Sequence, residues 1–544
     1  HIIFDSLTID ASGAGATYGF GVHLINNADS NVIRNCNILI NTTSTSTNYA
    51  GIVISNSETS ATTSGATRCD GNLVDNNTIT GGYYGITLTG NTAEPVTGNQ
   101  FINNRIRDFY NYGIYLNIVG PTLVEKNDIS RPTRTVLTTF YGVYGTGTSN
   151  GVQVSKNKIH NPFDGDVSST SDFFGVYFTG FDANAGTENI VSNNLIYDIN
   201  GEGDQTGLYN SSADYALYYH NTVVLEDATS VSTLTTRSFY QTLTATGIKV
   251  RNNIFTIKRG GSGTQHALYF NTATSQIESD RNVLFLHAGT NHFVGRVNAT
   301  DYATLAQWRA ASAQDAGSES IDPEYANVLM DDYTPTLGAI DNLGLPVGIT
   351  TDIVDAVRST TTPDAGATEF AVPPCQNPPT PGTTVVAPNS GFCIGTTVIL
   401  SLSGNSVGGG QTYQWQSAPT AAGPWTNISP VLNSPAFQWA VGTETFFQAV
   451  ITCSGTSVTS SVESVTLNPY LLAGVYTIDP SSPPSATNYQ SFQAAVSALD
   501  CGIGGDVFFD AVPGTYTEQI RIRPVGNANI NNRVTFRSQN GDRT

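Results

Sequence analysis

The first three hundred residues alternate between apolar and polar positions in short runs separated by asparagine and glycine. One pattern, Asn followed by any residue and then an apolar residue, recurs at intervals of 23 to 37 residues. Cys36 takes the asparagine place in an earlier copy, 41 residues before the first asparagine. Repeats at such intervals indicate a solenoid, a propeller or an array. The eight asparagines are Asn77, Asn104, Asn127, Asn157, Asn194, Asn221, Asn253 and Asn282.

A second pattern, Gly-apolar-x-apolar, lies between the copies of the first. Its glycines are Gly51, Gly85, Gly113, Gly151, Gly175 and Gly247. Short alternating runs between Gly and Asn favour strands of a few residues, joined by turns that tolerate a left-handed backbone. No helical run separates these strands, which argues against βαβ units and leucine-rich repeats, and the irregular intervals argue against propeller blades. The sequence therefore predicts an all-β parallel β-helix, with stacked inward Ile, Val and Leu and an asparagine ladder at one corner.

Changes in composition divide the chain into five parts. Residues 1–300 form the rungs, without an N-terminal cap, and 301–370 close the solenoid, beginning with a helix that Asp301 caps. Residues 371–385 are a proline-rich linker. Residues 386–469 contain four apolar strand patterns, and 470–544 contain a helix followed by short strands. The last part predicts the cap and first rungs of another β-helix, so we expect about one period of a tandem array.

Cysteine and tryptophan give the 386–469 part its predicted fold. Cys393, Trp415 and Cys453 follow one another in the order found in immunoglobulin-like sandwiches. Cys393 precedes the second strand, so a Cys393–Cys453 disulfide would lie at the rim of the sandwich. This pair is the disulfide candidate.

The overall charge narrows the class of partner. The formal net charge is −20, and only 12% of the residues are charged. A negative surface opposes binding to nucleic acid and to anionic membranes. No apolar run is long enough to span a bilayer. The six cysteines are few and none has metal-site spacing, which suits an exported protein.

Acidic residues on three predicted rungs raise a calcium hypothesis, since carboxylate oxygens are ligands that Ca²⁺ prefers. The alternative is that they are solvated turn residues. They are Asp164, Asp166, Asp172, Asp182, Glu188, Glu202 and Asp204. No other cofactor is indicated.

The sequence lacks the residue patterns of known catalytic β-helices. Many parallel β-helices cleave polysaccharides, but the paired carboxylates and basic residues of such sites do not recur here at matching positions. We therefore expect no enzyme, with a polysaccharide lyase or hydrolase as the alternative. Aromatic clusters such as Tyr83-Tyr84 and Phe173-Phe174 suit either sugar stacking or packing within the rungs.

The Asn repeat resembles the right-handed parallel β-helix repeat family, which implies a right-handed solenoid. Several other motifs resemble segments of very large surface proteins of Bacteroidetes. These are Asp364-Ala-Gly-Ala-Thr-Glu-Phe370, Tyr413-Gln-Trp-Gln-Ser417 and Gly514-Thr-Tyr-Thr-Glu518. The resemblance implies type IX secretion, an extracellular or cell-surface location, and an adhesin or filament role. It also implies tandem copies of the segment in one long chain, and surface glycans or other cells as partners.

Overall fold

The computed structural model describes residues 1–13, 17–66, 68–297, 299–387, 393, 397–432, 434–443, 445–465, 472–522 and 524–541. The chain folds as two compact units. The first contains His1–Pro323 and Leu337–Ala371, and the second contains Glu324–Thr336 and Val372–Thr544. The division after Ala371 coincides with the predicted start of the linker.

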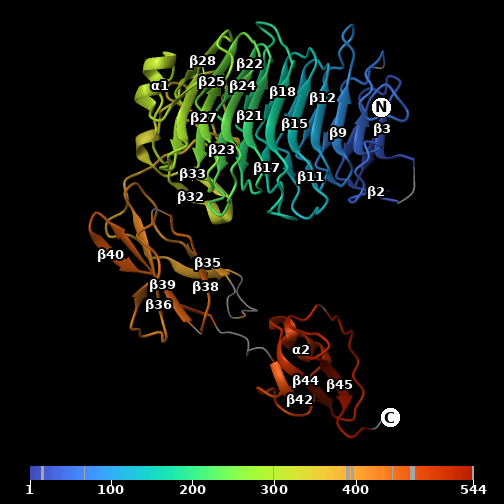
Figure 1. Ribbon diagram of the computed structural model, residues 1–544, viewed down its shortest axis with the longest axis vertical. Helices are drawn as coiled ribbons and strands as arrows, with labels where there is room; N and C mark the ends of the chain where they lie inside the picture. The colour runs from blue at the N-terminus through green and yellow to red at the C-terminus, as the bar shows by residue number, and fades with distance from the viewer. Residues whose placement is uncertain are drawn as a thin grey trace. The chain divides into compact units, whose positions relative to one another are not determined.

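The first unit is a parallel solenoid built from three sheets that run along its length (Figure 1). Sheet A contains β1 (Ile3–Asp5), β4 (Val32–Arg34), β7 (Leu73–Asp75), β10 (Gln100–Ile102), β13 (Thr122–Glu125), β16 (Val152–Ser155), β19 (Asn189–Ser192), β22 (Ala216–Tyr219), β25 (Ile248–Arg251) and β28 (Ile277–Asp280). Sheet B contains β2 (Thr8–Ala11), β5 (Asn37–Ile40), β8 (Thr78–Thr80), β11 (Arg105–Arg107), β14 (Asp128–Ser130), β17 (Lys158–His160), β20 (Leu195–Tyr197), β23 (Thr222–Leu225), β26 (Ile254–Ile257) and β29 (Val283–Leu286). Sheet C contains β3 (Gly19–Leu24), β6 (Tyr49–Ile54), β9 (Tyr84–Thr89), β12 (Tyr112–Asn117), β15 (Phe140–Thr146), β18 (Phe173–Thr179), β21 (Gln205–Ser211), β24 (Thr236–Thr242), β27 (Gln265–Phe270), β30 (His292–Val297) and the antiparallel β31 (Thr300–Tyr302).

Alternation along each strand fills the interior of the solenoid. In sheet B, Ile106 stacks between Ile79 and Ile129 in register, and all three are fully buried. Side chains at successive positions point to opposite faces of a sheet, so one residue in two enters the core. The predicted parallel β-helix is thus the fold of this unit.

The glycine pattern combines two structural positions, which the sequence did not separate. Gly51, Gly85, Gly113 and Gly175 lie in sheet C and face inward. A Cβ on Gly113 would lie 2.6 Å from the carbonyl oxygen of Gly142 on the next rung. Gly151 (φ +67°) and Gly247 (φ +66°) instead precede strands of sheet A and occupy left-handed turns. Close backbone approach explains the first set, and positive φ explains the second.

The predicted helix of the closing segment begins later than expected. Helix α1 is Leu305–Ser312, and its N-cap is Thr304, whose side chain forms a capping box with Gln307. Leu305 and Trp308 are buried. Asp301 is not the cap, because its carboxylate pairs with His266 and Arg296.

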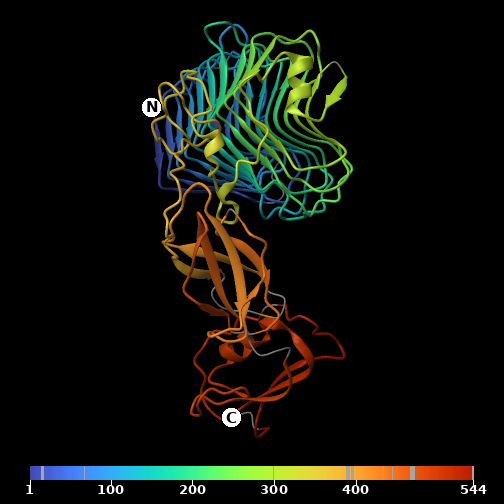
Figure 2. The same ribbon diagram turned by 90° about the vertical axis from the view of Figure 1, so that its left-hand side faces the viewer.

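Residues 324–336 of the predicted closing segment belong to the second unit, whereas residues 337–370 run back along the solenoid as a strap (Figure 2). The strap begins with the 3₁₀ turn η2 (Gly338–Ile340). Leu343 meets Arg281, whereas Asp355, later in the strap, meets Lys126, which is several rungs closer to the N-terminus. The strap therefore ties many rungs together.

The second unit contains two antiparallel sheets that share one hydrophobic core around Trp415. One sheet contains β34 (Thr383–Ala387), β35 (Thr397–Ser403) and β38 (Phe437–Ala440). The other contains β37 (Thr426–Asn427), β36 (Thr412–Ala418), β39 (Thr445–Cys453), β40 (Thr456–Thr459) and β41 (Glu463–Val465). The hairpin of β32 (Tyr325–Asn327), η1 (Val328–Met330) and β33 (Asp332–Pro335) belongs to this unit. Strand β34 overlaps residues 383–385, so the end of the predicted linker is part of a sheet.

The predicted Cys393–Cys453 disulfide is wrong. Cys375 pairs with Cys453, and Cys393 pairs with Cys501. Pro374 bridges Gly409 beside the second sheet, which brings the linker cysteine near the end of β39. Cysteine order alone does not distinguish these pairings.

The final segment forms a parallel sheet covered by a short helix. Its elements are β42 (Leu472–Ile478), β43 (Asn488–Tyr489), α2 (Phe492–Ser497), η3 (Ala498–Cys501), β44 (Ile503–Ala511) and β45 (Val534–Ser538). The short strands expected in this part include residues 514–522, which form no strand in the structure. The predicted boundary at 469/470 lies outside the described residues.

Candidate functional site

The eight repeated asparagines form a buried column between sheets A and B. The side chain of Asn157 donates from Nδ2 to Asn194 Oδ1 (2.9 Å) and to the carbonyl of Val124 (2.9 Å). Its own Oδ1 accepts from the backbone and side-chain nitrogens of Asn127. The same contact joins every neighbouring pair from Asn77 to Asn282. Cys36 continues the column through its backbone N–H, which donates to Asn77, and its thiol is buried.

A second, shorter column is formed by asparagines that directly precede strands of sheet A in the sequence. The sequence analysis did not predict it. Asn31 donates to Asn72, and Asn72 donates to Asn99, at 3.0 and 3.1 Å between Nδ2 and Oδ1. Each lies five positions before a residue of the main column. That constant offset was a usable signal in the sequence.

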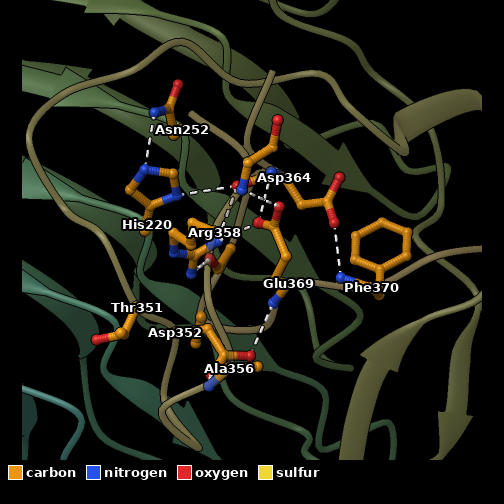
Figure 3. A network of polar contacts seen from close by, with 12 residues as sticks. His220, Asn252, Thr351, Asp352, Ala356, Arg358, Asp364, Glu369 and Phe370 are labelled. Carbon is orange, nitrogen blue, oxygen red and sulfur yellow. Dashed lines mark hydrogen bonds and ion pairs between the residues drawn. The ribbon is translucent and has the colours of Figure 1, made fainter. Parts of the chain in front are cut away.

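The strap is held by a polar network at the outer side of the main column (Figure 3). Arg358 donates to Asn193 and pairs with Glu369 at 3.0 Å, and its side chain is fully buried. His220 Nδ1 contacts the carbonyl of Asp364 at 2.9 Å. Burial raises the pKa of the Asp364 carboxyl to about 6, and burial also lowers the pKa of His220. The network fastens the strap to the rungs.

The seven acidic residues of the calcium hypothesis accept hydrogen bonds from neighbouring segments of the chain. Asp166 accepts from Ser168, Glu202 accepts from Ser230 at 2.8 Å, and Asp204 accepts from Thr235. Asp164, Asp172, Asp182 and Glu188 likewise accept from neighbouring chain. Across the described parts of the chain, no three His, Cys, Asp or Glu side chains come together as a metal site. Only Asp166 and Glu188 accept within their own turns, and the other five accept from residues at least 28 positions away on the adjacent rung.

Two rows of aromatic side chains cover the outer face of sheet C. The first row is Tyr84, Tyr112, Tyr141 and Phe174, and the second row is Tyr115, Tyr144, Tyr177, Tyr209, Tyr240 and Tyr269. We call both rows together the tyrosine face. All but Tyr84 are half-buried, whereas Phe140 and Phe173 point inward and are fully buried. The aromatic clusters of the sequence therefore divide between the core and this outer face.

Rung spacing fixes the distances between these rings. Tyr112 and Tyr141 are stacked with centroids 4.8 Å apart, and Tyr177 and Tyr209 are stacked at 4.3 Å. Such contacts stabilise neighbouring rungs and hold each ring in place. Burial, with the neighbouring Tyr209, raises the pKa of Tyr177 to about 12. The face is thus a rigid array of neutral rings and phenol groups at neutral pH.

Charged side chains lie at the end of the tyrosine face nearest α1. Arg296 donates to both carboxylate oxygens of Asp301 at 2.9 and 2.8 Å, and His266 Nε2 lies 2.8 Å from the same group. Burial lowers the pKa of His266 to about 4, so this ring is neutral at pH 7. Arg237 lies over the Tyr240 ring with Cζ 4.3 Å from the centroid. The sequence did not indicate this cluster, because its residues come from four separate strands.

Residues 20–203 match the family model described as the right handed beta helix region. This match and the three stacked sheets define the class of the first unit, a right-handed β-helix repeat. No curated protein matches the chain. Among the described residues, no helix is long and apolar enough to cross a membrane.

Proposed function

We propose that the chain is a structural and adhesive segment of an extracellular surface or filament protein. Its solenoid provides rigid reach, and its tyrosine face provides the contact surface for surface glycans or proteins on other cells. The observation that carries the proposal is the tyrosine face itself. Tyrosine offers a large apolar ring with a polar tip and is enriched at binding surfaces, where ordering it costs little conformational entropy.

The supporting contacts favour a fixed surface over a mobile one. The rings are spaced by the rungs, and each rung is held by asparagine hydrogen bonds on the opposite side of the solenoid interior. A preorganised surface loses little entropy on binding. Repetition of similar rungs then allows many weak contacts to add up to avidity.

We also propose that the segment is repeated in tandem, with immunoglobulin-like sandwiches between solenoids. In the final segment, Val475 pairs in parallel with Phe508, and Val507 pairs with Val534, 33 and 27 positions apart. The solenoid repeats at 23 to 37 positions. This common spacing and the covering helix α2 support a second solenoid. The two antiparallel sheets packed around the buried Trp415 support the sandwich type.

The contact surface is tested with the full chain on immobilised glycans and on cells. A Tyr144→Ser/Tyr177→Ser variant should lose at least tenfold in affinity, whereas Tyr144→Phe/Tyr177→Phe separates the rings from the hydroxyls. Tyr18→Ser is the matched control, because Tyr18 is exposed outside both rows. Unchanged binding by the double serine variant, with folding intact, would refute the tyrosine face as the adhesive surface.

Polysaccharide cleavage is a second candidate, and the charged cluster beside Tyr269 favours it. Arg237 and Arg296 flank the ring, each with Cζ 5.2 Å from its centroid. A lyase needs a base and a cation that stabilises developing negative charge. Formation of unsaturated sugar ends, measured by ultraviolet absorbance and lost in Tyr269→Phe, would establish this activity over the adhesive function.

A further inference from the structure

Two arginines flank Tyr269 on the tyrosine face, and only one of them is paired with a carboxylate. Arg296 is held by both oxygens of Asp301. Arg237 makes no hydrogen bond or ion pair to any residue that the structure describes. Instead, its guanidinium lies against the rings of Tyr240 and Tyr269, at 4.3 and 5.2 Å from Cζ to the centroids.

The acidic neighbours of Arg237 are directed elsewhere. Asp204 uses Oδ1 to accept from the backbone and hydroxyl of Thr235, at 2.7 and 2.8 Å. Asp172 accepts from the backbone of Asp204. Asp172 lies within electrostatic range of Arg237 without contacting it, and Asp204 lies within electrostatic range of Tyr240, the ring that Arg237 covers. Because a guanidinium forms strong paired bonds with planar or tetrahedral anions, the unpaired charge marks a place for one anionic group.

We propose that Arg237, between Tyr240 and Tyr269, is a subsite for one anionic substituent of a glycan, a carboxylate or a sulfate. This rests on the proposed glycan-binding function of the tyrosine face and specifies its ligand class. The ring contacts fix the direction of the guanidinium, and Thr206 and His266 occupy the neighbouring positions of its row. Asp172 and Asp204 limit the negative charge that the subsite accepts, which favours a single substituent over a dense polyanion.

The test compares binding of the full chain to polygalacturonate, heparin and neutral dextran by calorimetry. Arg237→Gln should weaken binding of an anionic glycan at least tenfold and leave dextran unchanged, while Arg237→Lys should retain part of the affinity. Arg105→Gln is the control, because Arg105 is exposed on sheet B. Because heparin carries carboxylates as well as sulfates, a loss with polygalacturonate assigns a carboxylate, and a loss with heparin alone assigns a sulfate.

Two results would overturn the proposal. One is equal binding of acidic glycans by Arg237→Gln and the unchanged protein, with equal melting temperatures showing that both are folded. The other is no preference of the unchanged protein for acidic over neutral glycans. Either result leaves the adhesive function standing if the Tyr144→Ser/Tyr177→Ser variant binds more weakly than the unchanged protein. If that variant binds as well as the unchanged protein, the adhesive function is refuted separately.

Discussion

Asparagines in this protein contribute differently to stability, depending on whether their side chains are buried and hydrogen-bonded. A ladder asparagine is buried and makes contacts in two directions, so each residue depends on both neighbours. An asparagine on the outer face of a strand, such as Asn37, is exposed and contributes little. Burial without partners is what makes the loss of a polar group costly.

Asn157→Ala should therefore lower the free energy of unfolding of the solenoid by about 2–4 kcal/mol, since it leaves several buried groups unpaired. Chemical denaturation measures this change. Asn37→Ala is the control and should stay within about 0.5 kcal/mol. Equal effects of the two substitutions would show that the asparagine column does not contribute specifically to the stability of the solenoid.

His266 should make the solenoid less stable in acid. Its pKa is about 4 in the folded chain because of burial, and about 6.5 when unfolded. Between these values the unfolded chain binds the proton more readily, so stability falls as the pH drops from 7 towards 4. The loss is about 3 kcal/mol at most. Denaturation from pH 7.5 to 4.5 should show a shallower decline in His266→Gln; identical slopes would exclude His266 as the cause.

At the level of strands and connections, close packing between rungs limits which residues each position accepts. Sheet C brings its backbone close to sheet B at the inward glycines, while its outer positions carry the tyrosines. The strap fastens the other side, where Asp355 pairs with Lys126 and Lys156 at 2.5 and 2.6 Å. Packing between rungs thus sets which residues each sheet tolerates.

Gly142→Ala should destabilise the solenoid by about 1–3 kcal/mol through overpacking. The added Cβ would lie 2.5 Å from the carbonyl oxygen of Gly175 and 2.9 Å from Ile159 Cγ2. Gly13→Ala is the matched control, because no atom lies within 4 Å of its Cβ position. Thermal unfolding measures both, and a neutral Gly142→Ala would show that the rungs can separate at this point.

At the level of the whole molecule, the two units have different sources of stability. The solenoid relies on stacked apolar side chains and hydrogen-bonded columns, and both of its cysteines are free and buried. The second unit is crosslinked by two disulfides that span 78 and 108 positions. Crosslinks of long loops restrict the unfolded chain. Redox conditions should therefore act on the two units unequally.

Cys375→Ser should lower the stability of the second unit by about 2–5 kcal/mol and leave the solenoid unchanged. Calorimetry that resolves two transitions measures this. Peptide mapping without reduction gives the control, since Cys393 must remain joined to Cys501 in the variant. A Cys393–Cys453 peptide in the unchanged protein would contradict the pairing seen here.

Local sequence carried much of the architecture because a solenoid contacts mainly its nearest rungs. The spacing of Asn77 and Asn104 was enough to predict the column, since each rung must place its asparagine above the last. The same locality made the buried face of α1, with Leu305 and Trp308, predictable.

The tertiary structure alone decided the contacts that join distant parts of the chain. Nothing in the order of residues indicated that Arg358 would reach Asn193, or that Cys375 would pair with Cys453. The outward tyrosine rows and the unpaired Arg237 also depend on which face each strand turns to the core. The sequence determined the repeat because the contacts that build it join neighbouring rungs. The site and the disulfides depend on contacts between residues far apart in the sequence, which the periodicity does not indicate.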